Sequence, residues 1–134
     1  MQTRQLGNSG TEVSAIGLGA MSLTDFYGCT DTQSSHAVLK KALDLGIDHL
    51  DTSNAYGNGL SEKRIGSFLD KQGSYRNSLF KIATKAGITR DRDGHRAFDN
   101  SPKHLKAELE KSLKRLGVDH IELFYIHRRD PNFS

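Results

Sequence analysis

The chain has 134 residues, of which 35% are hydrophobic, and a formal net charge of +3. This length has room for about one domain, and with its 13 glycines the composition lies at the low edge of the globular range and outside the disordered one. No apolar run approaches the length of a membrane span and the charges are interspersed, so we expect no membrane or nucleic-acid binding. The single cysteine, Cys29, and the absence of an apolar signal at the N-terminus predict a cytoplasmic protein.

Short apolar runs alternate with longer amphipathic segments along the chain. A turn cluster at 7–10 between two short polar–apolar stretches predicts a β-hairpin over residues 4–13. The charged segment 90–100 is predicted to be a mobile loop. The remaining pattern predicts strands over 13–18, 47–51, 79–84 and 118–126, and helices over 37–45, 61–69 and 102–116.

Local signals mark the ends of the predicted helices. Residues 30–33 have the capping-box pattern before the first helix, and Gly46 is expected just beyond its end. Ser101 followed by Pro102 is typical of a helix start. Because one helix lies in each gap between predicted strands, the chain has a βα repeat, which favours a parallel sheet with right-handed crossovers.

Polar side chains lie at the ends of these predicted strands. Asp51 closes the second strand, and Tyr56 lies in the loop just after it. Lys85 follows the third strand, and His127 ends the fourth. Because the carboxyl ends of parallel strands are where α/β folds place their sites, we expect these four side chains to share one site.

These positions lie in segments that resemble a known family. DTSNAYG at 51–57 resembles the D-T-A-x-x-Y-G segment of the aldo-keto reductases, and IATK at 82–85 resembles their third-strand lysine segment. YIHRRDP at 125–131 resembles their histidine segment, and GLGAM at 17–21 resembles their first-strand motif. The resemblance covers nearly the whole chain.

The resemblance implies a (β/α)8 barrel reductase that uses NADPH to reduce a small-molecule carbonyl substrate. By that resemblance Tyr56 is the general acid, and Lys85 stabilises the tyrosinate that forms when the proton leaves. Asp51 would pair with Lys85 and, in the family, also contacts the ribose of the cofactor. His127 would orient the substrate carbonyl and donate a hydrogen bond to the developing oxyanion.

Cofactor and substrate residues follow from the same comparison. Gly19, Ala20 and Met21 match family positions that approach the cofactor, whereas the segment 17–22 lacks the third glycine of a dinucleotide-binding fingerprint. Arg129 would meet an anionic group of the substrate, or it is a solvated loop charge. The remaining histidines lack metal-ligand spacing, so we expect no metal site.

The length of the chain limits this interpretation. A complete barrel needs about 250 residues, so we expect residues 1–134 to form one domain: a hairpin followed by the N-terminal half of a (β/α)8 TIM barrel. All four catalytic positions are present, while most cofactor positions of the family would lie beyond the fourth strand. The unpaired edges of the first and fourth strands would allow a homo-oligomer to form.

Several interpretations of the function stay open at this stage. The chain is the opening part of a longer NADPH-dependent reductase of aldehydes or ketones, an inactive half-barrel, or a half that completes one barrel by dimerising. A non-catalytic interaction module is the alternative to an enzyme, and some relatives serve as channel-associated subunits. The identity of the carbonyl compound cannot be read from these residues.

Overall fold

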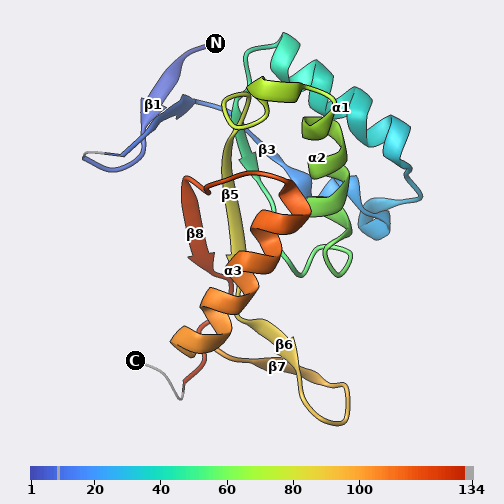
Figure 1. The fold of residues 1–134 in the computed structure, drawn as a ribbon, viewed down its shortest axis with the longest axis vertical. Coiled ribbons are helices and arrows are strands. Elements are labelled where there is room, and N and C mark those ends of the chain that lie inside the picture. Colours follow the sequence, from blue (N-terminus) through green and yellow to red (C-terminus); the bar gives the residue numbers. More distant parts are fainter. Residues whose placement is uncertain (9, 132–134) are drawn as a thin grey trace.

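The computed structural model describes residues 1–8 and 10–131, in which a parallel sheet is covered on one face by helices (Figure 1). The strands are β1 (Thr3–Gln5), β2 (Glu12–Ser14), β3 (Gly17–Gly19), β4 (His49–Asp51), β5 (Lys81–Ala86), β6 (Ile88–Arg90), β7 (Arg96–Phe98) and β8 (Leu123–Ile126). The α-helices are α1 (Thr32–Asp44), α2 (Leu60–Asp70) and α3 (Pro102–Leu116), and short 3-10 helices span Ala20–Leu23, Asp25–Tyr27 and Gly73–Tyr75. None of these helices is long and apolar enough to cross a membrane.

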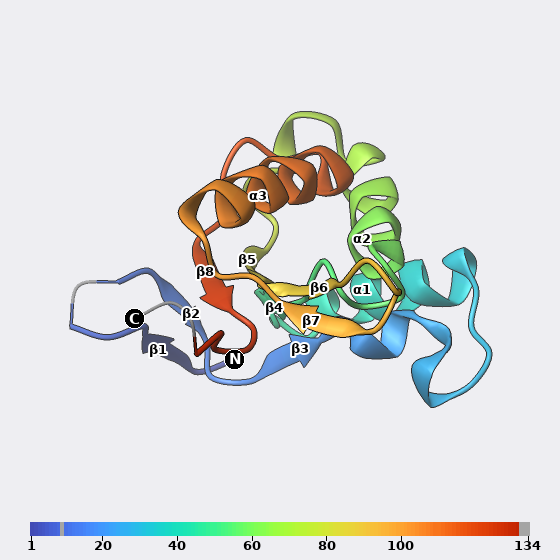
Figure 2. The ribbon, with the colours of Figure 1, turned by 90° about the horizontal axis from the view of Figure 1, so that it is seen from below.

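The central sheet has the order β3-β4-β5-β8, and every neighbouring pair is parallel. Figure 2 shows the three helices in an arc along one face of this sheet. The α/β class with a parallel half-barrel sheet is therefore confirmed. Within the described residues β3 and β8 are the sheet edges, as the sequence predicted.

The predicted N-terminal hairpin is present, but the strand expected over 13–18 is wrong. β1 and β2 pair antiparallel outside the central sheet, and the central sheet begins only at Gly17. Ser14 explains the break, because its hydroxyl donates to the Ile16 carbonyl at 2.8 Å and accepts from the backbone N–H of Asp48 at 3.1 Å. These bonds turn the chain from the hairpin into the sheet. Ser9, which belongs to the predicted hairpin turn, lies outside the described residues.

Helix α1 begins five residues before the predicted start. Its first residue is determined by a polar N-cap, whereas the prediction relied on where the apolar pattern begins. Asp31 is the N-cap and accepts a hydrogen bond from the Ser34 N–H at 2.6 Å, so the cap is not Thr30, the first residue of the capping-box pattern. Gly46 follows the helix with φ +76°, as predicted. Ser101 caps α3 and Gly117 ends it, also as predicted.

The core lies between the sheet and the helices. Its central residues are fully or almost fully buried: Leu39, Leu50, Ile65, Leu69, Phe80 and Leu116. The close approach of α2 to α3 requires a glycine, because a Cβ on Gly66 would lie 2.1 Å from the Arg115 carbonyl oxygen. This packing holds both helices against β5.

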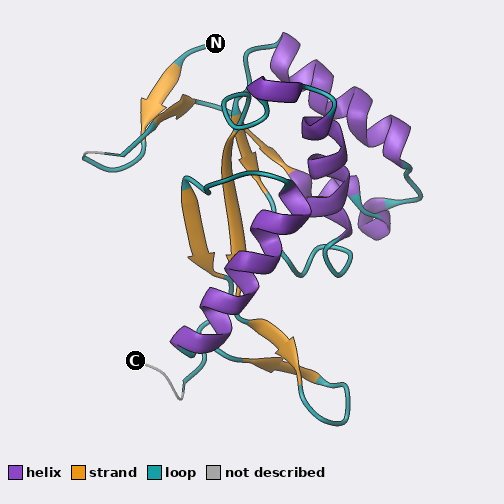
Figure 3. Cartoon of the chain, viewed as in Figure 1, coloured by secondary structure: helices purple, strands orange, loops and turns teal. Residues whose placement is uncertain are grey.

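A second hairpin, β6–β7, replaces the loop predicted over 90–100 (Figure 3). Ile88 pairs with Phe98 and Arg90 with Arg96, and Gly94 takes φ +85° in the connecting turn. The charged residues concealed the strand pattern, because these short strands are largely exposed and need no alternating apolar face. The last strand also starts later than predicted, at Leu123, since Asp119 is held outside the sheet by Asn77 at 2.6 Å.

Candidate active site

The four residues expected to share a site lie at the carboxyl ends of the central strands. Asp51 is the last residue of β4, and Lys85 lies within β5 rather than after it. His127 directly follows β8, where its backbone N–H donates to the Ala86 carbonyl at 2.8 Å. Tyr56 lies in the loop between β4 and α2. The geometry brings these four side chains together, and their catalytic roles stay a prediction.

The Lys85 ammonium group is held in one position by three hydrogen bonds. It donates to Asp51 Oδ2 and to the Thr52 carbonyl, each at 2.7 Å, and to the Tyr56 hydroxyl at 3.2 Å. An ammonium group has three hydrogens, so all of them are used. Only 14% of the lysine side chain is exposed, which limits competition from water. The cation is therefore fixed beside the phenol oxygen.

The loop that carries Tyr56 is tied to its neighbours on both sides. The Asn54 backbone N–H donates to the Lys85 carbonyl at 3.2 Å, and its side-chain amide donates to Glu108 of α3 at 2.7 Å. Gly57, with φ +58°, allows the turn after the tyrosine, where a Cβ would lie 2.9 Å from Thr24. These contacts therefore restrain the position of the Tyr56 ring relative to the ends of the strands.

His127 lies against Tyr56 with the two rings edge to face, 5.7 Å apart between centroids. Burial is the main cause that lowers the pKa of His127 below its usual value. The positive charges of Lys85, Arg128 and Arg96 lower this pKa further, and only Asp51 opposes them. Burial and these charges therefore favour the neutral imidazole, which carries one ring proton.

Two contacts at the site were missed by sequence reasoning. The Thr52 carbonyl accepts from Lys85, which no side-chain motif could reveal. The Ser53 hydroxyl lies 3.0 Å from Nδ1 of His127. For Ser53 a signal existed, because it stands where the resembling family segment has alanine.

Two cavities flank this cluster. The smaller, of about 360 Å³, is lined by Asp51, Lys85, Tyr125 and His127 among others. The larger, of about 960 Å³, contains Met21, Asn54, Tyr56, Arg96, His127 and Arg128 in its walls. Arg128 thus lines the larger cavity, whereas Arg129, the arginine named from the sequence, lines neither of these two.

The residues expected near a cofactor differ in how they face the site. Gly19 pairs with Asp51 in register, and the space where its Cβ would stand is open. Met21 lines the larger cavity. Ala20 is fully buried in the core, and its carbonyl accepts from the Ser61 hydroxyl at 2.8 Å. The methyl group and the carbonyl of Ala20 are thus both engaged inside the fold and not directed at a ligand. The contact of Ala20 with a cofactor stays a prediction.

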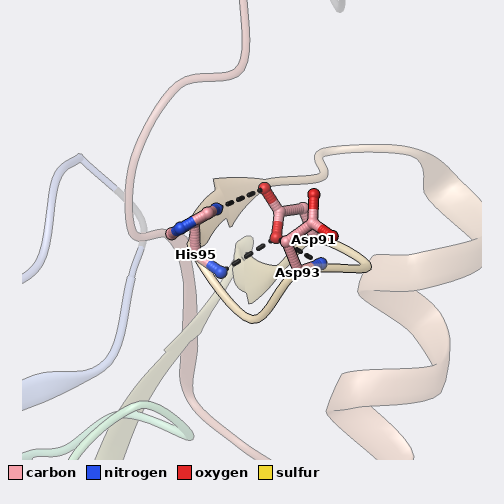
Figure 4. A group of neighbouring side chains, drawn as sticks. All are labelled: Asp91, Asp93 and His95. Atoms are coloured by element: carbon pink, nitrogen blue, oxygen red, sulfur yellow. Dashed lines mark hydrogen bonds and ion pairs between the residues drawn. The ribbon is translucent and has the colours of Figure 1, made fainter.

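Three potential metal ligands, Asp91, Asp93 and His95, approach one another in the β6–β7 turn (Figure 4). All three are exposed. Asp91 Oδ1 accepts from the backbone N–H of Asp93 at 3.0 Å and of His95 at 2.8 Å. These bonds are those of an ordinary turn and account for the grouping. The expectation of no metal site stays a prediction.

Comparison with known proteins shows which family the chain resembles in sequence and in fold. The model of the aldo/keto reductase family matches residues 15–134. A fission yeast (Schizosaccharomyces pombe) protein, aldo-keto reductase yakc [NADP(+)], is 41% identical over 127 residues, which cover 94% of this chain and 36% of the yeast protein. L-glyceraldehyde 3-phosphate reductase of Escherichia coli K12 is 39% identical over 135 residues, covering 98% of this chain and 38% of that protein.

Among solved structures, the holo form of an aldo-keto reductase from Bacillus halodurans superposes with a TM-score of 0.82 at 34% identity. The match covers 99% of this chain and 42% of that structure. The chain thus spans well under half the length of the relatives it matches. The match over nearly all of the chain, in sequence and in structure, shows that it belongs to the aldo/keto reductase family.

Proposed function

We propose that the chain carries the catalytic residues of an NADPH-dependent oxidoreductase that reduces aldehyde or ketone carbonyls to alcohols. The observation that supports this most is the Lys85 ammonium group, which contacts both Asp51 and the Tyr56 hydroxyl beside a neutral His127. A fixed cation next to the phenol oxygen is placed to stabilise negative charge that develops there during proton transfer. That arrangement suits proton donation to a carbonyl oxygen.

Each side chain has one task in the proposed reaction. A reduced nicotinamide, when bound, would supply the hydride for the carbonyl carbon. Tyr56 gives its hydroxyl proton to the carbonyl oxygen, and the tyrosinate that remains accepts a hydrogen bond from Lys85. Asp51 holds the lysine in place by the ion pair at 2.7 Å. His127 donates a ring N–H to the carbonyl oxygen and so orients it.

The residues at the strand ends fit a nicotinamide nucleotide in part. Asp51 uses Oδ2 for Lys85, and among residues 1–8 and 10–131 its Oδ1 has no hydrogen-bond partner. A second carboxylate oxygen without a partner, on a side chain that is 37% exposed, suits a ribose hydroxyl. The open space at Gly19 lies in register with this carboxylate. We therefore propose that Asp51 and the segment from Gly19 to Met21 border the cofactor.

The charge of the larger cavity favours carbonyl substrates that carry an anionic group. Arg90, Arg96 and Arg128 line it, and no ion pair of Arg96 or Arg128 is formed with the described part of the chain. The acid in the same wall, Glu108, is already engaged by Lys111 at 2.7 Å. A relative of this chain is named for reducing a phosphorylated aldehyde. A carboxylate or phosphate on the substrate would complement these arginines.

Replacing Arg128 by glutamine is expected to raise KM for an anionic aldehyde about threefold to tenfold, because an exposed charge-assisted contact is lost. Succinic semialdehyde is a suitable anionic probe, and butanal is the neutral aldehyde of equal chain length. The matched control is Arg129→Gln. It removes the same charge from the next residue in the chain, which does not line the larger cavity. A KM that changes equally for both aldehydes would exclude this role for Arg128.

The proposed function is tested by following NADPH oxidation by the purified natural protein with simple aldehydes and ketones. We expect NADPH-dependent consumption of the carbonyl compound with formation of one alcohol per NADPH. NADPH binding measured by fluorescence separates a missing cofactor site from a missing substrate. Absence of both binding and turnover would exclude the reductase.

A non-catalytic interaction module or inactive half-barrel is the alternative proposal, favoured by the open edges at β3 and β8. Unpaired strand edges pair readily with another chain. This alternative predicts a concentration-dependent homo-oligomer without NADPH binding, measurable by sedimentation and the same fluorescence titration. Tight binding of NADPH would argue against it.

A cytoplasmic location also belongs to the proposal, since Cys29 is an exposed free thiol.

A further inference from the structure

The Ser53 hydroxyl is a fully buried group beside the proposed catalytic residues. It lies just after β4, with none of its surface exposed. Three polar atoms surround its oxygen: Nδ1 of His127 at 3.0 Å, the Ala55 backbone nitrogen at 3.1 Å and the Lys85 carbonyl oxygen at 3.4 Å. The direction of each hydrogen bond decides which nitrogen of the imidazole carries the proton.

The hydroxyl has one hydrogen and must place it on one of two acceptors. The Ala55 nitrogen is a donor, so the serine oxygen accepts there. The Lys85 carbonyl already accepts from the Asn54 backbone N–H at 3.2 Å, and its distance to the serine oxygen is the longest of the three. Nδ1 of His127, at 3.0 Å, has no other partner in the described part of the chain. The imidazole nitrogen is therefore the better acceptor.

We infer that Ser53 donates its hydroxyl proton in a hydrogen bond to Nδ1 of His127 and thereby fixes the neutral tautomer with its proton on Nε2. Nε2 is then a donor, left free for a ligand of the two cavities that His127 lines. In the opposite tautomer Nδ1 would donate to Ser53, and the lone pair of Nε2 would repel a carbonyl oxygen. Ser53 is in this sense a positioning residue, because it acts only through His127.

The tautomer follows from the hydrogen bonds of Ser53 alone, while its use in orienting a carbonyl rests on the proposed reductase function. Burial and nearby positive charge lower the pKa of His127, which favours the neutral ring, with one unprotonated nitrogen. A hydrogen bond to that nitrogen stabilises the neutral ring further. Loss of the serine hydroxyl therefore raises the pKa of His127.

The test combines nitrogen NMR of histidine-labelled protein with the pH profile of turnover, in the natural protein and in Ser53→Ala and Ser53→Thr. The natural protein and Ser53→Thr should show the proton of His127 on Nε2. Ser53→Ala should show a mixture of tautomers, protonation of His127 at higher pH in the NMR spectra, and a kcat about three- to tenfold lower across the pH profile. Alanine is the residue that the resembling family segment has at this position, so the fold should tolerate it.

Ser35→Ala is the matched control, because Ser35 is equally buried but donates to the Asp31 carbonyl in α1, far along the chain from His127. It should leave the tautomer and the pKa of His127 unchanged. A proton found on Nδ1 in the natural protein, or a tautomer that Ser53→Ala does not alter, would overturn the inference. Lack of turnover with the expected tautomer would instead contradict the proposed function and leave the assignment of Ser53 standing.

Discussion

If the proposed reductase function holds, replacement of Tyr56 by phenylalanine is expected to lower kcat/KM for carbonyl reduction by about two to four orders of magnitude. The change removes only the hydroxyl oxygen that accepts from Lys85 at 3.2 Å. The ring contacts with His127 and with the lysine ammonium, 5.0 Å from the ring centroid, do not need that oxygen. Without a proton donor at this position, the alkoxide formed by hydride transfer is left uncompensated. Steady-state kinetics with one aldehyde measures the effect.

The control for this variant is Tyr27→Phe, which removes a phenol that is 71% exposed and lines neither of the two cavities. It should leave kcat/KM unchanged. Both variants should keep the unfolding midpoint of the natural protein, since neither phenol oxygen is part of the core. Full activity in Tyr56→Phe would show that another group donates the proton, and the proposed mechanism would be wrong.

The residues that the sequence could identify are those whose position depends on the topology. In a parallel sheet the carboxyl ends of neighbouring strands meet at one edge, so Asp51 and His127 could be grouped without any knowledge of side-chain direction. Lys85 was expected after its strand and lies inside it. An error of this size did not matter, because the side chain is long enough to reach both Asp51 and Tyr56.

The features that the sequence could not identify depend on single polar contacts. Ser14 ends one strand pairing and starts another by hydrogen bonds to groups more than thirty residues away. The β6–β7 hairpin is held by its backbone ladder and an aspartate-containing turn, and it leaves no apolar alternation to detect. Ser53 and Ala20 show the same limit, because only the fold decides that both of these small residues are fully buried and that the Ser53 hydroxyl lies against His127.

A buried carboxylate, that of Glu62, is expected to contribute strongly to the stability of the fold around the site. Glu62 of α2 is fully buried, and its two carboxylate oxygens accept from different elements. Oε1 accepts from the Thr84 hydroxyl of β5 at 2.7 Å, and Oε2 accepts from Nε of Arg115 in α3 at 2.6 Å. Thr84 directly precedes Lys85, so this carboxylate joins both helices to the strand that carries the site lysine.

Replacing Glu62 by alanine is expected to lower the free energy of unfolding by about 3–5 kcal/mol, because removing one partner leaves the other charge buried without compensation. Arg115 is only 20% exposed and keeps a single side-chain contact, to Ser112 at 3.1 Å. The Thr84 hydroxyl loses its acceptor as well. Glu62→Gln should cost less, since its amide still offers an oxygen to one of the two donors. Urea unfolding followed by circular dichroism measures both changes.

The matched control is Lys40→Ala, which breaks an ion pair of similar length, 2.9 Å, on the surface of α1. Its partners are 70% and 51% exposed, so its loss should cost less than about 1 kcal/mol. The difference between the two changes in unfolding free energy separates the effect of burial from the effect of charge pairing. If Glu62→Ala and Lys40→Ala had equal and small effects, the carboxylate would not be what holds α2 and α3 to β5. The β5 backbone at Lys85 would then be held by the sheet ladder and not by this carboxylate.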